Sequence, residues 1–268
     1  MIIQILIPLV ILGVLGVIFG SLLGFASKKF AVPEDPLFPK LRDVLPGATC
    51  GGCGFAGCDA YARAVASGEA QPGKCPVGGS ACTQAMSTIL GVETVQEAPQ
   101  VAFVHCSGTC EATSDRFQYH GVLSCREAAM LPGGGQKACA YGCLGFGSCE
   151  QVCPFDAIHV IQGVAVVDEA NCKACGRCVK ECPKHLISLI PKDTKVRLAC
   201  ANAERGKDVK MVCEAGCIAC GLCVRSCEAK AIQMVNNLPK IDAALCTGCG
   251  ACAEKCPVSA LHRVTQEA

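Results

Sequence analysis

Four short segments in the second half of the chain share one pattern: a cysteine, three other residues, a second cysteine and then a short apolar run. They read SCEQVCPFDAIHV, RCVKECPKHLISL, LCVRSCEAKAIQM and ACAEKCPVSALHR. Strand-like runs, GVAVVDEANC and NLPKIDAALC, join the first segment to the second and the third to the fourth. The spacing predicts two pairs of repeats, at about 137–190 and 213–265, held together by cysteine chemistry more than by a large apolar core.

The chain contains 26 cysteines among 268 residues, so the redox compartment decides what they do. Residues 2–25 are almost wholly apolar and carry no charge, which predicts a transmembrane helix. A cleaved signal peptide is the alternative, but no basic segment precedes the apolar run and no small-residue cleavage site is evident. Lys28 and Lys29 follow the span, so we expect the rest of the chain in the cytoplasm, where thiols stay reduced.

The spacing of the cysteines within the repeats indicates the metal. Two quartets, each followed by proline, match the Cys-x2-Cys-x2-Cys-x3-Cys-Pro run of two-cluster ferredoxins, and a third has Glu228 in place of the proline. In this arrangement the fourth cysteine of each run binds the other cluster. Zinc also takes four thiolates, but structural zinc sites usually use two separated pairs. The expected ligand sets are Cys217, Cys220, Cys223 with Cys256, and Cys246, Cys249, Cys252 with Cys227.

The first repeat departs from this pattern, because Phe146 stands where Cys220 stands in the second pair. Cys139 lies four residues before Cys143 and is the nearest cysteine that can replace the missing ligand. We therefore expect two further clusters in the first pair. Their ligands are Cys139, Cys143, Cys149 with Cys182, and Cys172, Cys175, Cys178 with Cys153.

The N-terminal cysteines follow a different spacing. Cys50, Cys53 and Cys58 lie in the glycine-rich stretch ATCGGCGFAGC, and Cys75 follows with a proline after it. Glycine lets such a loop turn tightly and bring amide N–H groups toward the sulfurs. We expect a separate 4Fe-4S module here, with two short amphipathic helices at about 58–70 and 78–92.

Six cysteines remain. Cys82 lies on an apolar helix face and is interpreted as a buried core thiol. Cys106, Cys110 and Cys125 resemble three ligands of a sixth cluster whose fourth is Cys200 or Cys213, and reduced structural thiols are the alternative. Both interpretations stay open, so the sequence predicts five 4Fe-4S clusters or six.

The expected organisation is a transmembrane anchor (1–26), a proline-rich linker with a short helix around Leu41 (27–46), a small mostly helical 4Fe-4S domain (47–95) and two ferredoxin-like α+β units (101–190 and 191–268). The net charge of +1 offers no field for nucleic acid. No Gly-x-Gly-x-x-Gly run opens a helix after a strand, so we expect no flavin or NAD bound by this chain. No catalytic residue is predicted.

The combination of anchor, N-terminal motif and tandem repeats resembles one family, the B subunit of the Rnf complex, an ion-translocating ferredoxin:NAD oxidoreductase. The resemblance rests on FGSLLGFASKKFAV, ATCGGCGFAGCDAYARAV and CPVGG, with the repeats behind them, and points to the longer form of anaerobes such as clostridia. It implies a single-pass subunit of the cytoplasmic membrane that takes electrons from reduced ferredoxin and relays them to membrane subunits. On this interpretation the chain is part of a translocase but holds no complete active site.

Three other functions fit the same residues. The chain could donate electrons to a cytoplasmic sensor, as in the similar Rsx system, or reduce a corrinoid protein. A non-catalytic iron–sulfur redox sensor is the third. The span itself contains no ionisable side chain, so we expect the Na⁺ or H⁺ to move through partner subunits.

Overall fold

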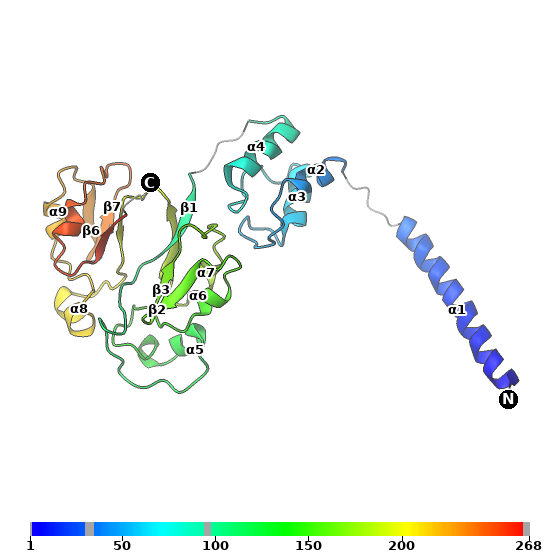
Figure 1. The fold of residues 1–268 in the computed structure, drawn as a ribbon, viewed down its shortest axis with the longest axis horizontal. Coiled ribbons are helices and arrows are strands. Elements are labelled where there is room, and N and C mark those ends of the chain that lie inside the picture. The colour runs from blue at the N-terminus through cyan, green and yellow to red at the C-terminus, as the bar shows by residue number, and fades with distance from the viewer. Residues whose placement is uncertain (1, 30–34, 94–97, 265–268) are drawn as a thin grey trace.

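The structure is a computed structural model that describes residues 2–29, 35–93 and 98–264, with side chains of the first helix described from Ile11 on. Figure 1 shows three parts in chain order: a long helix, a small helical unit, and a larger body that holds all the strands. The expected linker and the polar connector near 93–100 lie partly outside the described residues, at 30–34 and 94–97.

Helix α1 (Ile2–Lys29) is apolar along its length and stands apart from the other elements in Figure 1. Its described stretch, Ile11–Lys29, has a mean hydropathy of 1.8 and none of it is buried in the protein. Leu12 is 71% exposed and Leu23 is 67% exposed. A helix that presents apolar side chains all round needs apolar surroundings, and this one is long enough to cross a bilayer. The helix therefore fits a single-pass membrane anchor.

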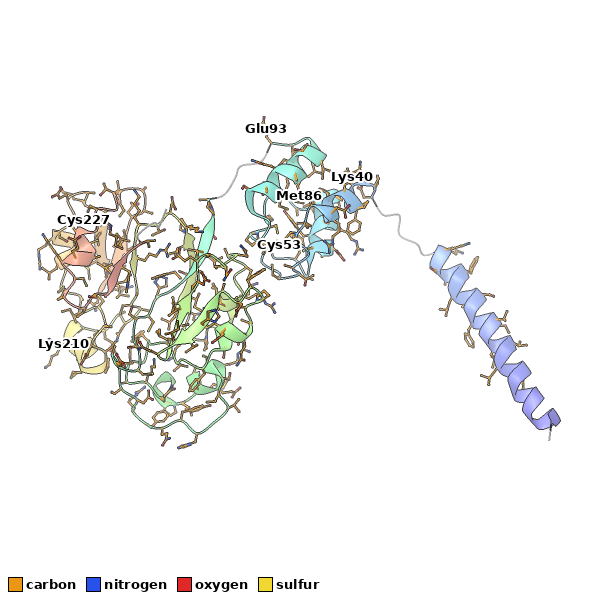
Figure 2. All side chains as sticks on the ribbon, viewed as in Figure 1. Lys40, Cys53, Met86, Glu93, Lys210 and Cys227 are labelled. Atoms are coloured by element: carbon orange, nitrogen blue, oxygen red, sulfur yellow. The ribbon has the colours of Figure 1, made fainter. Side chains whose placement is uncertain are left out.

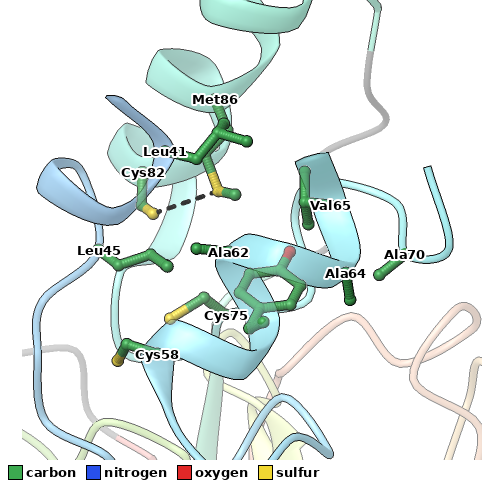
Figure 3. Packing of buried hydrophobic residues seen from close by; sticks show 11 residues of the cluster. Leu41, Leu45, Cys58, Ala62, Ala64, Val65, Ala70, Cys75, Cys82 and Met86 are labelled. Atoms are coloured by element: carbon green, nitrogen blue, oxygen red, sulfur yellow. Dashed lines mark hydrogen bonds between the residues drawn. The ribbon is translucent and has the colours of Figure 1, made fainter. Parts of the chain in front are cut away.

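The helical unit consists of α2 (Leu37–Asp43), α3 (Cys58–Ala66) and α4 (Gly79–Leu90), which agree with the expected short helices. Its core is built on Leu41, Tyr61 and Met86, none of which is exposed (Figure 3). Because Leu41 belongs to this core, the packed unit begins at Leu37 and not at residue 47. Gly91 ends α4 in the left-handed conformation, which glycine adopts without strain.

The body is made of two repeat units, which we define as residues 100–191 and 196–263. In each unit the first and last strands pair, and the two middle strands form a hairpin; all pairs are antiparallel. The strands of the first unit are β1 (Gln100–Val104) with β4 (Ile187–Pro191), and β2 (Ile158–Ile161) with β3 (Val164–Val167). Those of the second unit are β5 (Val196–Leu198) with β8 (Leu261–Arg263), and β6 (Ile232–Val235) with β7 (Leu238–Ile241).

Short helices connect these strands. The first unit contains α5 (Cys125–Ala129), the 3-10 turn η1 (Pro132–Gly134), α6 (Ser148–Gln151) and α7 (Arg177–Glu181). The second contains α8 (Gly206–Val212), α9 (Leu222–Arg225) and α10 (Ala251–Glu254). The apolar cores are small, and several of their members are cysteines, such as Cys149 and Cys178 in the first unit and Cys252 in the second. The expected apolar strand after each repeat cysteine pair is confirmed as β2, β4, β6 and β8.

The two repeat units are joined by hydrogen bonds between segments distant in sequence. The Thr113 hydroxyl donates to the Val212 carbonyl at 2.7 Å, and the Glu214 amide donates to the Ala112 carbonyl at 2.8 Å. The buried Arg197 pairs with Glu169 of the other unit. An ion pair buried on one side is costly to break, because the remaining charge would be left without a partner. The units therefore form one packed body.

Candidate metal centres

The N-terminal cysteines converge on one side of α3. Cys58 begins this helix, and its sulfur and that of Cys75 lie on the same side in Figure 3. Both are buried, whereas Cys50 and Cys53 are half-buried. The amide of Gly78 donates to Cys75 Sγ at 3.4 Å. Cys82 lies in the apolar core, and its thiol donates to Met86 Sδ at 3.8 Å (Figure 3). As a hydrogen-bond partner, the same thiol lowers the pKa of Cys75 to about 6.

The four repeat loops have the same backbone conformation. The residue two positions after the first cysteine of each loop has a left-handed φ of +51° to +78°, and the glycine two positions further on is left-handed too. The first set is Gly145, Ala174, Ala219 and Gly248, and the second is Gly147, Gly176, Gly221 and Gly250. The left-handed conformation costs a non-glycine residue about 1–2 kcal/mol, so surrounding structure must hold Ala174 and Ala219 in it.

The last cysteine of each loop also sits in a repeated turn. The residue three positions later is left-handed, at Asp156, His185, Lys230 and Ser259. The next amide then donates to the cysteine sulfur at 3.3–3.4 Å, from Ala157 to Cys153, Leu186 to Cys182, Ala231 to Cys227, and Ala260 to Cys256. Amide donors on sulfur stabilise a thiolate and raise the potential of a bound iron–sulfur cluster. The turn at Cys227 forms without a following proline.

In the second unit, a cysteine of the last repeat lies beside the three cysteines of the loop before it. Cys217, Cys220, Cys223 and Cys256 line one hollow with about 350 Å³ of space free of protein atoms. Burial raises the pKa of Cys217 to about 11, and the neighbouring thiols of Cys200, Cys223 and Cys256 raise it as well. Cys227, Cys246 and Cys252 lie in the small core of the same unit, and Cys249 is exposed beside them.

In the first unit, the structure changes one expected ligand. Cys125, Cys143, Cys149 and Cys182 line a hollow of about 370 Å³, and Cys139 is not among its lining residues. Burial raises the pKa of Cys149 to about 12, and the thiols of Cys143, Cys125 and Cys182 add to the rise. The Cys125 amide donates to Ser148 Oγ at 2.9 Å, which fixes the start of α5 beside α6. Cys125 therefore shares this hollow with Cys143, Cys149 and Cys182, where the sequence placed Cys139.

The four cysteines of the second expected set of the first unit lie near one another. Burial raises the pKa of Cys178 to about 11, with added effects from the neighbouring thiols of Cys175, Cys172 and Cys153. The amide of Ala102 in β1 donates to Cys172 Sγ at 3.5 Å.

The remaining cysteines separate into two groups. Cys106, Cys139, Cys200 and Cys213 line a third hollow, of about 370 Å³, between the two repeat units. Cys110 is exposed and is not among the cysteines that line the three hollows, although the sequence grouped it with Cys106 and Cys125. Sequence spacing alone did not show this division, because the four cysteines come from four separate segments.

The donor sets suit a cluster better than a single ion. Within the described ranges, no group of three Cys, His, Asp or Glu side chains is placed to hold one metal ion. Zinc would bring four sulfurs to about 2.3 Å from one point. The four sulfurs of a 4Fe-4S cluster bind four different irons and lie farther apart, around a hollow. Three hollows of nearly equal size, each lined by four cysteines, fit the latter.

Neighbouring cysteine sets touch one another. If Gly52 carried a Cβ atom, it would lie 3.0 Å from the Cys175 carbonyl oxygen, so the N-terminal loop packs directly on the loop of the first unit. The thiols of Cys50 and Cys175 are also close enough to influence each other's charge. In Figure 2, Cys53 lies on the side of the helical unit that faces the body, and Cys227 lies at the far side of the body.

Known families match the chain at three places. Residues 45–77 match a model described as a putative Fe-S cluster, residues 164–187 a 4Fe-4S binding domain, and residues 216–260 a 4Fe-4S dicluster domain. These matches cover the N-terminal cysteines and parts of both repeat units. They show iron–sulfur domains in the chain.

Curated relatives extend the similarity to most of the chain. The B subunit of the Na⁺-translocating ferredoxin:NAD⁺ oxidoreductase complex of Acetobacterium woodii is 48% identical over 89% of this chain and 72% of its own length. The B subunit of the proton-translocating complex of Clostridium ljungdahlii is 39% identical over 88% and 84%. The B subunit of the ion-translocating oxidoreductase complex of Methanosarcina acetivorans is 41% identical over 87% and 88%. The chain therefore belongs to the family of Rnf complex B subunits, which are part of ion-translocating ferredoxin:NAD⁺ oxidoreductases.

Proposed function

We propose that this chain is the membrane-anchored electron-relay subunit of an ion-translocating ferredoxin:NAD⁺ oxidoreductase complex. It receives electrons from reduced ferredoxin and passes them to membrane subunits. The observation that carries the proposal is the packing of the N-terminal cysteine loop directly on the Cys175 loop of the first repeat unit, which brings two ligand sets together. The names of the relatives supply the reaction in which such a relay takes part.

The geometry supports five ligand sets within the matched and repeated regions. A 4Fe-4S cluster bound by such a set carries a single electron at a potential that depends on hydrogen bonds to the sulfurs and on solvent exposure. The chain's own residues hold the thiolates, donate amide hydrogens to them and keep most of them from water. The sets are Cys50, Cys53, Cys58, Cys75; Cys125, Cys143, Cys149, Cys182; Cys153, Cys172, Cys175, Cys178; Cys217, Cys220, Cys223, Cys256; and Cys227, Cys246, Cys249, Cys252.

Exposure favours the second repeat unit as the entry end. Cys220 and Cys249 are exposed, whereas the N-terminal set contains two buried and two half-buried cysteines. A soluble donor must approach closely, so the exposed cysteines of the second unit are the more accessible to it. The N-terminal unit lies next in the chain to α1, which places it nearest in sequence to the membrane subunits. Electrons on this account enter at the second unit and leave from the N-terminal set.

The flanks of α1 give the orientation that we propose. Lys28 and Lys29 end the helix, and positively charged residues favour the cytoplasmic side of a span. The repeat units would then face reduced ferredoxin and a compartment that keeps thiols reduced. Because residues 2–25 contain no ionisable side chain, the transported ion moves through partner subunits.

Anaerobic mixing with reduced ferredoxin tests the proposal. The full chain in detergent, with its clusters reconstituted, is mixed with a slight excess of reduced ferredoxin and frozen at successive times for EPR. We expect all the clusters, including the N-terminal one, to become reduced. Clusters that stay oxidised in the presence of reduced ferredoxin would contradict the proposal and leave the redox sensor as the better interpretation.

A further inference from the structure

We propose that a further 4Fe-4S cluster is bound at the junction of the two repeat units and passes electrons between the clusters of one unit and those of the other. This inference rests on the proposed electron-relay function. Its ligands are Cys106, Cys139, Cys200 and Cys213. None of the three family models covers all four, since the matched ranges are 45–77, 164–187 and 216–260.

The first support is the hollow itself. It encloses about 370 Å³ of space free of protein atoms, part of it open to solvent, as does the hollow lined by Cys149, and the hollow lined by Cys223 encloses about 350 Å³. Small residues, including Gly108, Gly142 and Gly216, line it along with the four cysteines. A Cβ added at Gly108 would lie 3.5 Å from Cys106 Sγ and 3.6 Å from Cys213 Sγ, so it would stand against two of the sulfurs.

The second support is an internal symmetry of the ligands. Cys106 follows β1 by two residues, and Cys200 follows β5 by two residues. Cys139 precedes the first repeat loop of its unit by four residues, and Cys213 does the same in the second unit. Each repeat unit therefore contributes one cysteine after its first strand and one before its first loop. Core thiols would have no reason to occur at matched positions and meet at the junction.

The third support is the set of hydrogen-bond donors on the sulfurs. The amide of Gly108 donates to Cys106 Sγ at 3.3 Å, and the Asn202 side-chain amide approaches Cys139 Sγ at 3.6 Å. Asn202 is only 2% exposed, and its side-chain amide also donates to Glu204 Oε2 at 3.3 Å, which leaves the second amide hydrogen available for Cys139. A thiolate is a better acceptor than a thiol, so the donors suit sulfurs that carry negative charge.

A buried cation adds to this electrostatic pattern. Lys137 is 4% exposed, and its ammonium donates to the carbonyls of Gly108 at 2.9 Å and Gly163 at 2.7 Å. Within the described part of the chain, no carboxylate is recorded in an ion pair with Lys137. A negatively charged cluster at the junction supplies the opposite charge that this buried lysine otherwise lacks.

The junction site connects to a ligand set on each side. On the first unit's side, the Cys143 amide donates to Cys106 Sγ at 3.4 Å. On the second unit's side, the Cys217 amide donates to Cys200 Sγ at 3.3 Å. In both cases a residue that holds one cluster donates directly to a sulfur that holds the next. A single electron enters from one neighbouring site and leaves to the other, and no bond is formed or broken.

The resulting order of sites runs from the second unit through the junction to the N-terminal loop. The set with Cys249 and the set with Cys217 lie in the second unit. The set with Cys217 contacts the junction site. The junction contacts the set with Cys143, and that set shares its unit with the set containing Cys175, which contacts the N-terminal loop. The junction cysteines thus accept hydrogen bonds from a ligand set of each repeat unit.

Iron counting on the full chain tests the site. Wild-type protein, reconstituted anaerobically, should hold about 24 iron atoms for six 4Fe-4S clusters. Cys200→Ala and Cys213→Ala should each lose about four irons, or show the EPR signal of a three-iron cluster when oxidised. Cys110→Ala, which removes an exposed cysteine of the same region, should match wild type.

Two outcomes would overturn the site. One is a wild-type count of about 20 irons that neither Cys200→Ala nor Cys213→Ala changes. The other is a disulfide between two of the four cysteines, found by mass spectrometry of protein kept and alkylated without oxygen. A variant that fails to fold is recognised because it loses iron from all sites. Two variants in different segments are used so that the misfolding of one does not leave the site untested. Reduction by ferredoxin is a different measurement, so the relay function can survive the failure of this site.

Discussion

The contact between Gly52 and Cys175 gives the sharpest test of how the N-terminal set is coupled to the body. A Cβ at Gly52 would lie 2.9 Å from Pro76 Cγ, 3.0 Å from Cys175 O and 3.1 Å from Cys175 Cα. The backbone at Gly52 is not left-handed, so the barrier to a larger residue is space alone. Two of these three neighbours are backbone atoms, which cannot rotate away. Gly52→Val therefore forces the helical unit and the first repeat unit apart.

The size of the effect follows from the crowding. Inserting side-chain atoms into a closely packed contact typically costs about 1–3 kcal/mol. A difference of about 1.4 kcal/mol changes an equilibrium tenfold, so the docked arrangement should become about 5- to 150-fold less populated relative to the separated one. If the docked arrangement carries the electron, reduction of the N-terminal cluster should slow by up to the same factor, which is reached when the separated arrangement predominates. The clusters of the two repeat units should be reduced at the wild-type rate.

Rapid-freeze EPR after mixing with reduced ferredoxin measures this rate, and the magnetic interaction between the reduced N-terminal cluster and its neighbour reports the distance between them. Gly57→Ala is the matched control in the same loop. Gly57 has an extended φ of 165°, and a Cβ there would meet only Thr49 Cγ2, at an ordinary 3.7 Å. Wild-type rate and wild-type magnetic interaction in Gly52→Val, with unchanged iron content, would refute the reasoning.

Three further substitutions test the ligands and the core. Cys125→Ala should remove the cluster of the first repeat loop or convert it to a three-iron form, measured by iron content and EPR; full retention would return Cys139 to that role. Cys58→Ala should remove the N-terminal cluster while the repeat units keep theirs, as seen in the Mössbauer spectrum, and an unchanged iron count would disprove the assignment. Tyr61→Phe removes a hydroxyl that donates to the Gln71 carbonyl at 3.0 Å and accepts from the Lys74 amide at 3.1 Å. The free energy of unfolding of the helical unit, measured in denaturant, should fall by about 1–3 kcal/mol. An unchanged denaturation midpoint would show that water replaces these bonds.

Much of this architecture follows from patterns that are local in sequence. The helices around Leu41 and Tyr61 have clear apolar faces, and the strands after each repeat loop are short apolar runs bounded by turns. The exchange of Cys256 into the hollow with Cys217 follows from a spacing that leaves the fourth cysteine out of reach of its own cluster.

The ligand that replaces Phe146 could not be found in the same way. Sequence proximity favoured Cys139, four residues before Cys143. The loop keeps the repeat conformation, with Gly145 left-handed, and the fourth cysteine of its hollow, Cys125, begins α5, which is fixed by the hydrogen bond to Ser148. Which cysteine joins the set depends on contacts between segments that are distant in sequence, and the spacing of cysteines along the chain does not show these contacts. Cys139 and Cys213 each stand four residues before the first loop of their repeat unit. This match was the one sequence signal that groups them with each other and not with the loops.

The boundary of the helical unit shows a similar limit. Prolines through residues 27–46 indicated a linker, since proline lacks an amide donor and interrupts regular structure. Pro36 and Pro39 nevertheless lie before and within the first turn of α2, where the amide has no helical partner in any case. Leu41 and Leu45 then pack on α3 and α4, and this burial, which proline content does not reveal, draws the segment into the unit.

The central claim is that electrons cross the whole chain, from the second repeat unit through the junction to the N-terminal set. Rapid-freeze EPR of full-length Cys200→Ala beside wild type, after mixing with reduced ferredoxin, tests it most directly. We expect the clusters of the second repeat unit to be reduced in both proteins, and the N-terminal cluster to be reduced in wild type but to stay oxidised over the same times in the variant. An N-terminal cluster reduced as fast in Cys200→Ala as in wild type would contradict the account.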